Sequence, residues 1–431
     1  MPRLADPRFA PDCTIDLDGR PIPARAGESV AVALLAAGIA LVGRSGKYHR
    51  PRGAFCLAGS CHTCLARVGG LPNRRTCRVP CEPGLSVESQ NAVPTARRDL
   101  LAGLDLVYAG GLDHHHLMTW SNLANRAAVA FSRRLAGSGA LADGAPPLPA
   151  LALEERFDAL VIGAGPAGLG AAEALATAGE RVLLAESDAL PGGRLRCALG
   201  LPGDPPLTWA TEVARAVAAA GGEVACGLTA LGVWRDGGSP LVALRVEAAP
   251  AGLRLVRALR LVVASGTSAS PPCFERNDLP GVLAARGLLR ALAEDGLVAG
   301  ARVLVAGMGT EAEAAAARLA AAGVEVRRAE AVTAAHGGER VRAASLAGGA
   351  RLACDAIVFA GPRAPASELA RQAGAAVELD AASGGWRVRA DHSGRTGLPG
   401  LLAAGEVTGG MSAAEAAGGG RRAGEAAHAD R

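Results

Sequence analysis

Four cysteines near the N-terminus constrain this chain more than any other feature of its sequence. They are Cys56, Cys61, Cys64 and Cys77, in the spacing C-x4-C-x2-C-x12-C. The first three match the loop that carries three thiolate ligands of a plant-type [2Fe–2S] cluster, and a fourth thiolate from further along the chain completes such a site. The glycine and small residues between the first two cysteines let backbone N–H groups turn toward the sulfurs. The spacing therefore predicts a [2Fe–2S] cluster on these four residues.

Other interpretations of the cysteines stay open at this point. Cys81 competes for the fourth position, because it follows Cys77 by four residues. Cys61 and Cys64 alone have the spacing of a thioredoxin-like redox pair, but no βαβ pattern surrounds them. A four-thiolate zinc site more often uses two C-x2-C pairs, and only one is present. Further cysteines without such spacing are expected to be small apolar side chains: Cys197, Cys226, Cys273 and Cys354.

Length and composition narrow the class of protein. A chain of 431 residues predicts two or three domains. The net charge of +4 is spread along the chain, and aromatic residues make up only 3%, which argues against a nucleic-acid partner. The N-terminal segment lacks the apolar core of a signal peptide, and the apolar stretch at 30–42 is too short to span a bilayer. Ten cysteines without a secretory signal favour ligands and free thiols over disulfides, so we expect a cytoplasmic protein without a transmembrane segment.

The segment around the cysteines has the element order of a small ferredoxin. Asp18-Gly19 is a hairpin turn signal, and Ser29 can cap a helix. Strands are expected at residues 14–17, 21–24, 65–68 and 85–88. Hairpin, helix, cluster loop and strands together predict a β-grasp fold. We therefore assign residues 1–100 to a ferredoxin-like [2Fe–2S] domain and residues 101–155 to a connecting segment and linker.

A first glycine-rich turn follows the strand expected at 157–162. It reads Gly-Ala-Gly-Pro-Ala-Gly at residues 163–168, and a helix and a second strand ending at Glu186 come after it. In this motif the glycines allow a tight turn and close approach of a pyrophosphate, the helix N-terminus supplies N–H donors, and the acid accepts from the ribose hydroxyls. Residues 191–194 (Pro-Gly-Gly-Arg) favour FAD over NAD. The predicted cofactor-binding residues here are Gly163, Gly165, Ala167, Gly168, Glu186, Gly193 and Arg194.

A second glycine-rich turn leaves two interpretations open. Residues 307–312 read Gly-Met-Gly-Thr-Glu-Ala, between a strand at 302–306 and a helix that reaches Ala322. Glu311 places a carboxylate at the helix N-terminus, where it would repel a pyrophosphate. The turn either binds NAD(P) or belongs to a Rossmann domain that is kept for its fold.

A third signal completes the flavin pattern. Residues 398–406 form a strand that ends in Gly405-Glu406, before a final helix. In flavoproteins with two dinucleotide domains, the acid at this position meets the ribityl chain, and Glu406 stands where Asp is usual. The predicted fold is therefore α/β: a β-grasp domain followed by glutathione-reductase-like Rossmann folds. The FAD-binding domain is expected at residues 156–274 and 386–431, and the second Rossmann domain, NAD-binding-like, is inserted at 275–385.

Several segments together resemble a known family. Gly-Arg-Ser-Gly-Lys-Tyr-His-Arg-Pro-Arg-Gly at 43–53 leads into the cysteine loop, and further matching segments lie at 88–91, 279–282 and 409–414. They resemble the α subunit of heterotetrameric sarcosine oxidase and its relatives, which are the opine oxidases, hydrogen cyanide synthase and the D-hydroxyproline dehydrogenases that consist of several subunits. The resemblance implies FAD on this chain, a [2Fe–2S] cluster whose fourth ligand is Cys77, and amine oxidation on a separate β subunit, with an FMN at a subunit interface.

The resemblance predicts an electron-transfer subunit of an amine or amino-acid oxidase or dehydrogenase, acting on a substrate of the sarcosine, opine, hydroxyproline or glycine type. No catalytic residue is assigned to this chain, because the amine pocket is expected on the partner. Many relatives carry a further cysteine-rich domain after the last helix, whereas this sequence stops soon after that helix, so we expect no second cluster there. Two other classes stay open: a self-sufficient NAD(P)H-dependent reductase, and a nucleotide-binding scaffold.

Two histidine-containing segments are ambiguous. The basic run from Lys47 to Arg52 is either a solvated loop or a phosphate or subunit contact. Three consecutive histidines at 114–116 would point about 100° apart on a helix, which disfavours a shared metal ion.

Overall fold

The computed structural model describes residues 3–46, 48–104, 121–135, 154–235, 238–247 and 252–430. Contacts divide the chain into two compact units. Unit 1 contains residues 1–146 and 271–361, and unit 2 contains residues 147–270 and 362–431. Of the insert expected at 275–385, the last residues, 362–385, thus fall in unit 2. The exact domain boundaries stay predictions.

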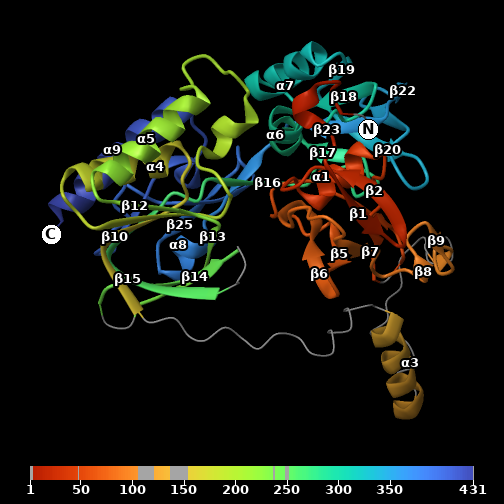
Figure 1. Ribbon diagram of the computed structural model, residues 1–431, viewed down its shortest axis with the longest axis horizontal. Helices are drawn as coiled ribbons and strands as arrows, with labels where there is room; N and C mark the ends of the chain where they lie inside the picture. The colour runs from red at the N-terminus through yellow and green to blue at the C-terminus, as the bar shows by residue number, and fades with distance from the viewer. Residues whose placement is uncertain are drawn as a thin grey trace. The chain divides into compact units, whose positions relative to one another are not determined.

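The N-terminal part of unit 1 is the predicted ferredoxin-like fold (Figure 1). Its five-stranded sheet has the order β2-β1-β7-β5-β6. The Ser29 side chain accepts a hydrogen bond from Val32 N (3.3 Å) and starts the helix, and Asp18 and Gly19 take positive φ in the hairpin turn. Leu34 and its neighbours on the helix pack against the sheet. The elements are β1 (Cys13–Leu17), β2 (Arg20–Ala24), α1 (Val30–Ala36), β3 (Gly43–Arg44), β4 (Pro51–Arg52), β5 (Leu65–Val68), β6 (Leu71–Arg75), η2 (Thr76–Arg78), β7 (Ser86–Glu88), β8 (Pro94–Thr95) and β9 (Arg98–Asp99), with η1 (Pro7–Phe9) before them and α3 (Asn122–Leu135) after them.

The second part of unit 1 is a Rossmann-type layer. A parallel four-stranded sheet has the order β17-β23-β18-β19, and a separate three-stranded sheet, β20-β21-β22, is inserted in the chain between β19 and β23. The second glycine turn lies between β18 and α7, as predicted. The elements are β17 (Val282–Ala284), α6 (Ala285–Asp295), β18 (Arg302–Ala306), α7 (Thr310–Ala321), β19 (Glu325–Ala329), β20 (Val332–His336), β21 (Ala343–Leu346), β22 (Arg351–Ala353) and β23 (Ala356–Phe359).

Unit 2 is built on a seven-stranded sheet. Its order is β12-β11-β10-β15-β14-β13, and β27 pairs with residues 261–263 of β15, beyond the part of β15 that pairs with β14. Helices α4, α5 and α9 cover one face, and α8 lies on the opposite face (Figure 1). The elements are β10 (Glu154–Ile162), α4 (Pro166–Thr177), β11 (Val182–Glu186), η3 (Gly193–Cys197), α5 (Leu207–Ala219), β12 (Glu223–Cys226), β13 (Leu228–Trp234), β14 (Leu241–Val246), β15 (Gly252–Val263), β16 (Thr267–Ala269), β24 (Arg363–Pro365), α8 (Glu368–Gln372), β25 (Val377–Asp380), β26 (Gly385–Val388), β27 (Leu401–Ala403), η4 (Gly405–Thr408) and α9 (Ala413–Ala429).

Segments from the two ends of unit 2 meet in this sheet. β27 pairs in parallel with β15, with Leu261 opposite Leu401. Helix α9 crosses α4 at glycines: a Cβ at Gly420 would collide with the carbonyl oxygen of Ala167, and one at Gly424 would lie 2.5 Å from that of Ala171. Close packing of the two helices thus brings the end of β27 to the start of α4.

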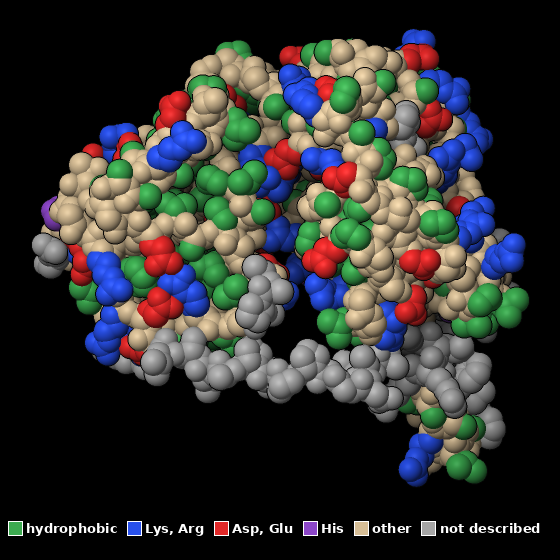
Figure 2. Space-filling view, in the orientation of Figure 1, with side chains coloured by type: hydrophobic (Ala, Val, Ile, Leu, Met, Phe, Trp, Pro, Cys, Tyr) green, Lys and Arg blue, Asp and Glu red, His purple; other side chains and the backbone are tan. Residues whose placement is uncertain are grey.

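Opposite charges are interspersed on the visible face of unit 2 (Figure 2). In the first halves of β10, β12 and β15, Arg254 forms ion pairs with Glu155 and Glu223, each at 2.6 Å, and Arg257 pairs with Glu154 at 2.8 Å. Among the described residues, no helix has both the length and the apolar character needed to cross a bilayer.

Candidate cofactor sites

The cysteine loop turns its backbone toward its own first sulfur. Cys56 Sγ accepts hydrogen bonds from the backbone N–H groups of Ala58 (3.4 Å) and Ser60 (3.3 Å). Positive φ at Leu57, Gly59 and His62 makes this tight path possible. Such N–H···S contacts favour the thiolate form, which is the form that binds iron.

The structure brings the four predicted cysteines into mutual contact. Hydrogen bonds from Cys61 and then Cys77 lower the pKa of the Cys56 thiol, and a hydrogen bond from Cys77 lowers the pKa of Cys64 to about 7. The same bonds raise the pKa values of Cys61 and Cys77, which act as the donors. The contacts thus join the four thiols in the order Cys61, Cys56, Cys77, Cys64. In the part of the chain that the structure describes, no set of three or more ligand side chains converges on a single ion. Two pairs of soft thiolates suit a two-iron core, in which each iron takes two protein sulfurs.

The structure separates Cys77 from its competitor Cys81. Cys77 lies in η2 and contacts the three-cysteine loop through Cys56 and Cys64. Cys81 is 1% exposed and packs in the apolar core of the ferredoxin-like sheet. Burial, followed by the nearby Glu28 carboxylate, raises the pKa of the Cys81 thiol to about 12. A thiol held neutral in an apolar core is a poor iron ligand.

The first glycine turn leaves open space at one position. A Cβ at Gly163 would lie 2.5 Å from the carbonyl oxygen of Ala264, and one at Gly168 would collide with the backbone of Gly163, so packing alone requires these two glycines. At Gly165 the only heavy atom within 4 Å of an added Cβ is Gly193 Cα, at 4.0 Å. The turn therefore has room in front of the α4 N-terminus, where a pyrophosphate lies in this motif.

Glu186 ends β11 beside that turn. Its Oε2 accepts from Ala164 N (2.7 Å), and its Oε1 accepts from Asp188 N (2.8 Å) and Ser187 Oγ (3.1 Å). Burial, and then the negative charge of Asp188, raises the pKa of the Glu186 carboxyl. Each carboxylate oxygen can accept more than one hydrogen bond, so the group retains capacity for ribose hydroxyls.

Arg194 and Glu406 meet although they lie far apart in sequence. Arg194 Nη1 donates to Glu406 Oε1 (3.2 Å) and to the carbonyl oxygen of Met411 (2.7 Å), while Thr267 Oγ1 donates to Glu406 Oε2 (3.4 Å). Arg194 Nε is buried and has no hydrogen-bond partner within the described residues. A buried donor in this state is unusual, and a ligand with acceptor oxygens would satisfy it. Gly405, at φ +80, lies against Ala167 at the start of α4.

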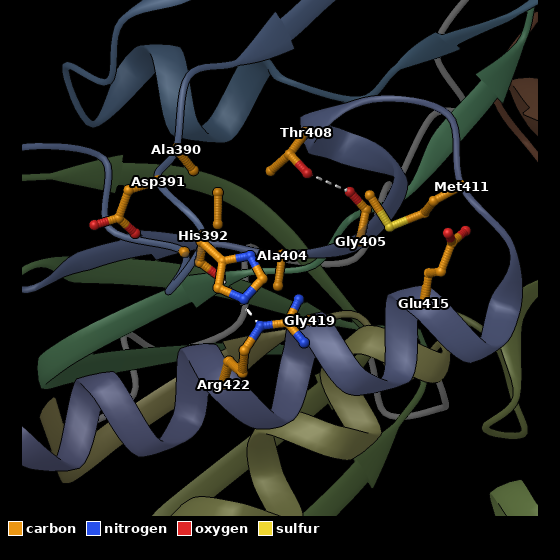
Figure 3. Close-up of a pocket in the computed structure, with 12 residues that line it drawn as sticks. Ala390, Asp391, His392, Ala404, Gly405, Thr408, Met411, Glu415, Gly419 and Arg422 are labelled. Atoms are coloured by element: carbon orange, nitrogen blue, oxygen red, sulfur yellow. Dashed lines mark hydrogen bonds between the residues drawn. The ribbon is translucent and has the colours of Figure 1, made fainter.

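A cavity that the sequence analysis did not predict opens beside Gly405 (Figure 3). Its volume is about 290 Å³, and the loop at 390–394, the end of β27 and helix α9 line it. Thr408 Oγ1 donates to the Gly405 carbonyl (2.9 Å), and Arg422 Nε donates to the His392 carbonyl (3.2 Å). Gly405 belongs to the third flavin signal, but no local motif marks His392 or Arg422, which lie 30 residues apart in the chain.

The second glycine turn carries an internal ion pair. Arg286 of α6 contacts Glu311 through both Nη2 (2.9 Å) and Nε (3.0 Å). A second carboxylate, Glu313, also lies in the first turn of α7. The helix dipole stabilises two carboxylates at this helix start, and their negative charge disfavours a pyrophosphate there. The arginines of β19 pair locally: Arg328 lies 3.6 Å from Glu313.

Three family models match parts of the chain. Residues 11–92 match the 2Fe-2S iron-sulfur cluster binding domain, residues 161–205 match the NAD(P)-binding Rossmann-like domain, and residues 296–420 match the pyridine nucleotide-disulphide oxidoreductase family. The first match contains all four cysteines, and the second contains the first glycine turn and Glu186.

Curated relatives extend these matches. The chain is 35% identical to sarcosine oxidase subunit alpha of Rhizobium meliloti over 292 residues, which is 64% of this chain and 29% of that protein. It is 41% identical to hydrogen cyanide synthase subunit HcnA of Pseudomonas aeruginosa over 80 residues, 19% of this chain and 76% of that protein. The chain belongs to the family of sarcosine oxidase α subunits and hydrogen cyanide synthase subunits.

The chain is an oxidoreductase that joins a 2Fe–2S domain to dinucleotide-binding folds, which supports iron–sulfur and FAD-type cofactors. It spans less than a third of the length of the sarcosine oxidase α subunits it matches. L-Proline dehydrogenase from P. horikoshii shares the fold over 98% of this chain and 74% of that chain, with a TM-score of 0.76 and 22% identity.

The basic run from Lys47 to Arg52 makes internal contacts. His49 is 2% exposed and its Nδ1 lies 2.8 Å from Asp99 Oδ2, while Arg52 forms an ion pair with Asp278. Arg50 stacks over the Tyr48 ring at 5.1 Å. Four residues of the run, Tyr48, His49, Arg50 and Arg52, thus make contacts within unit 1. Lys47 and the histidines at 114–116 lie outside the described residues.

Proposed function

We propose that this chain is the FAD- and [2Fe–2S]-containing electron-transfer subunit of an amine or amino-acid oxidase or dehydrogenase. The observation that carries the proposal is the presence of a four-thiol cage and a flavin-type dinucleotide site in one chain. When bound, FAD exchanges electrons in pairs and the cluster exchanges them singly, so the combination converts two-electron oxidation into one-electron delivery. The amine is oxidised on a β subunit of the amino-acid-oxidase type, with an FMN at the subunit interface.

Each set of residues has a defined part in this proposal. Cys56, Cys61, Cys64 and Cys77 hold the cluster as thiolates, and the N–H groups of the loop stabilise that charge. Gly165 admits the pyrophosphate, while Gly163, Ala167 and Gly168 shape the turn around it. Glu186 accepts from the ribose hydroxyls, and Gly193, Arg194, Gly405 and Glu406 form the wall toward the ribityl chain. We also propose a cytoplasmic location, because none of the ten cysteines, all of which lie in the described residues, forms a disulfide, which suits a reducing compartment.

The partner requirement gives the direct test. The purified chain, loaded with its cofactors, should not turn over sarcosine, proline, hydroxyproline, glycine or opines with an artificial dye acceptor. Relatives of the chain are subunits of larger oxidases, and the amine pocket is expected on the partner. Adding a β subunit of the amino-acid-oxidase type should start turnover of one of these amines. Substantial turnover by the chain alone would contradict the subunit proposal.

A second candidate function is an NAD(P)H-dependent reductase, which the match of residues 296–420 to the pyridine nucleotide-disulphide oxidoreductase family favours. We expect NADH and NADPH to reduce the flavin of the isolated chain more slowly than a typical enzyme turnover of about 10 per second. Glu311 occupies the start of the phosphate-binding helix, and Ala312 replaces the third glycine. Stopped-flow absorbance measures the rate, with dithionite as the control for a reducible flavin. Faster reduction by NADH would make the reductase the better assignment.

A further inference from the structure

Helix α6 of the second Rossmann domain packs against the cluster loop, the segment that carries Cys56, Cys61 and Cys64. The backbone N–H of Ala284, at the helix start, donates to the carbonyl oxygen of Phe55 (2.9 Å). At Gly287 an added Cβ would collide with the carbonyl oxygen of Cys56 and would lie 3.1 Å from the Leu57 side chain. The first predicted cluster ligand thus rests its backbone on the first turn of α6, and only glycine allows that approach.

The other end of α6 is also held by the ferredoxin-like domain. Arg25 forms an ion pair with Asp295 and donates to the carbonyl oxygen of Glu294 (3.1 Å). The ring of Phe9 packs against Gly296, the residue that ends the helix. Both ends of one helix therefore contact the domain that carries the cysteines.

The ion pair between Arg286 and Glu311 connects α6 to the second glycine turn. Arg286 precedes Gly287, and its side chain is 10% exposed. The planar guanidinium contacts the carboxylate through two nitrogens, which fixes the direction of the pair as well as its distance. Glu311 lies in the first turn of α7, where the helix dipole also favours its charge. The carboxylate of Glu311 is thus engaged inside the protein.

We propose that the second Rossmann domain is a docking base for the iron–sulfur domain, in which Gly287 and the Arg286–Glu311 pair are positioning residues for the cluster loop. This role rests on the proposed cluster ligands and goes beyond the proposed electron-transfer function. In this role the domain needs no bound nucleotide. Helix α6 contacts the backbone at Cys56, and the Arg286–Glu311 ion pair fixes α6 to α7.

The test compares two glycine substitutions in the same domain. Gly287→Ala should displace the cluster loop, whereas Gly338→Ala should not, because an added Cβ at Gly338 has no atom within 4 Å. In Gly287→Ala we expect iron loss to a chelator to be about tenfold faster or more, the size of effect seen when groups that orient metal ligands are removed. The EPR spectrum of the reduced cluster should also change. FAD content should stay at the wild-type level, since the flavin site lies in unit 2.

Glu311→Gln keeps the side-chain shape and removes the charge, so it tests the ion pair and serves as the decisive variant if Gly287→Ala does not fold. We expect faster iron loss than in the wild type. Wild-type iron retention and EPR signal in Gly287→Ala, or in Glu311→Gln where that variant decides, would overturn the docking role. If Gly287→Ala has an effect and Glu311→Gln has none, the docking role stands for Gly287 and the Arg286–Glu311 ion pair has no part in it. Retention of a normal cluster in Cys77→Ser would instead show that the proposed ligand set has failed.

Discussion

Replacing Cys77 with serine is expected to abolish or strongly alter the EPR signal of the reduced chain and to lower its iron content. The hydroxyl of serine is a harder and less acidic ligand than the thiol, so it holds iron poorly where a thiolate is needed. Cys77 contacts both Cys56 and Cys64, so its loss removes two of the three contacts that join the four thiols. Iron and acid-labile sulfide per chain, measured in anaerobically purified protein, provide the second readout.

Cys81→Ser is the matched control for this substitution. Cys81 lies four residues later and is buried in the core of the ferredoxin-like sheet. We expect its replacement to leave the cluster signal unchanged, with only a modest loss of stability from a hydroxyl in an apolar environment. The reverse result, with Cys81→Ser losing the cluster and Cys77→Ser keeping it, would reassign the fourth ligand. Absence of two irons from anaerobic wild-type protein would refute the cluster itself.

The choice between these two cysteines shows what the sequence can and cannot determine. Spacing predicts that three thiols share a loop, because the loop is local. It does not decide between Cys77 and Cys81, since either lies within reach of a cluster in an extended chain. The fold decides their placement: β6 and η2 bring Cys77 to the loop, while the backbone N–H of Cys81 donates to the carbonyl oxygen of Glu28 and the thiol points into the core.

Secondary-structure elements can be predicted from local signals because those signals, like the cysteine spacing, depend on nearby residues. Ser29 caps its helix through Val32 N, and Gly163 takes the positive φ that the strand-to-helix turn requires. Each signal depends on residues within a few positions of it, so it can be read without the tertiary structure.

Contacts between distant residues could not be predicted in this way. Arg194 and Glu406 are 212 residues apart, and their motifs predict a shared flavin site but no hydrogen bond between them. Glu311 was recognised as an obstacle to a pyrophosphate, but its partner Arg286 lies on another helix. No sequence signal predicts the contact between the cluster loop and Gly287. A single glycine in an amphipathic helix does not show which backbone packs against it.

Gly165→Val is expected to yield a folded protein that purifies with little or no FAD. Gly165 has φ −74° and ψ −178°, an extended conformation that a β-branched residue readily adopts. Apart from the chain neighbours of Gly165, Gly193 Cα is the only atom of the described residues within 4 Å of an added Cβ, so the apo fold should accept the valine. The methyl groups then occupy the space in front of the α4 N-terminus, where the pyrophosphate must approach the backbone closely. Flavin absorbance per chain measures the loss, and the thermal midpoint of the apoprotein measures the fold.

Three further variants make this result specific to the pyrophosphate. Gly238→Val, at an exposed position of unit 2 with no atom within 4 Å of an added Cβ, should retain FAD at the wild-type level. Gly168→Ala should destabilise the apoprotein, since its Cβ would collide with the backbone of Gly163. Glu186→Ala should also purify flavin-poor, because each hydrogen bond to a charged acceptor contributes roughly 1.5–3 kcal/mol. It also leaves the N–H groups of Ala164 and Asp188 without that acceptor, so Gly165→Val separates binding from stability more cleanly. Full FAD occupancy in a well-folded Gly165→Val protein would place the flavin elsewhere in the chain.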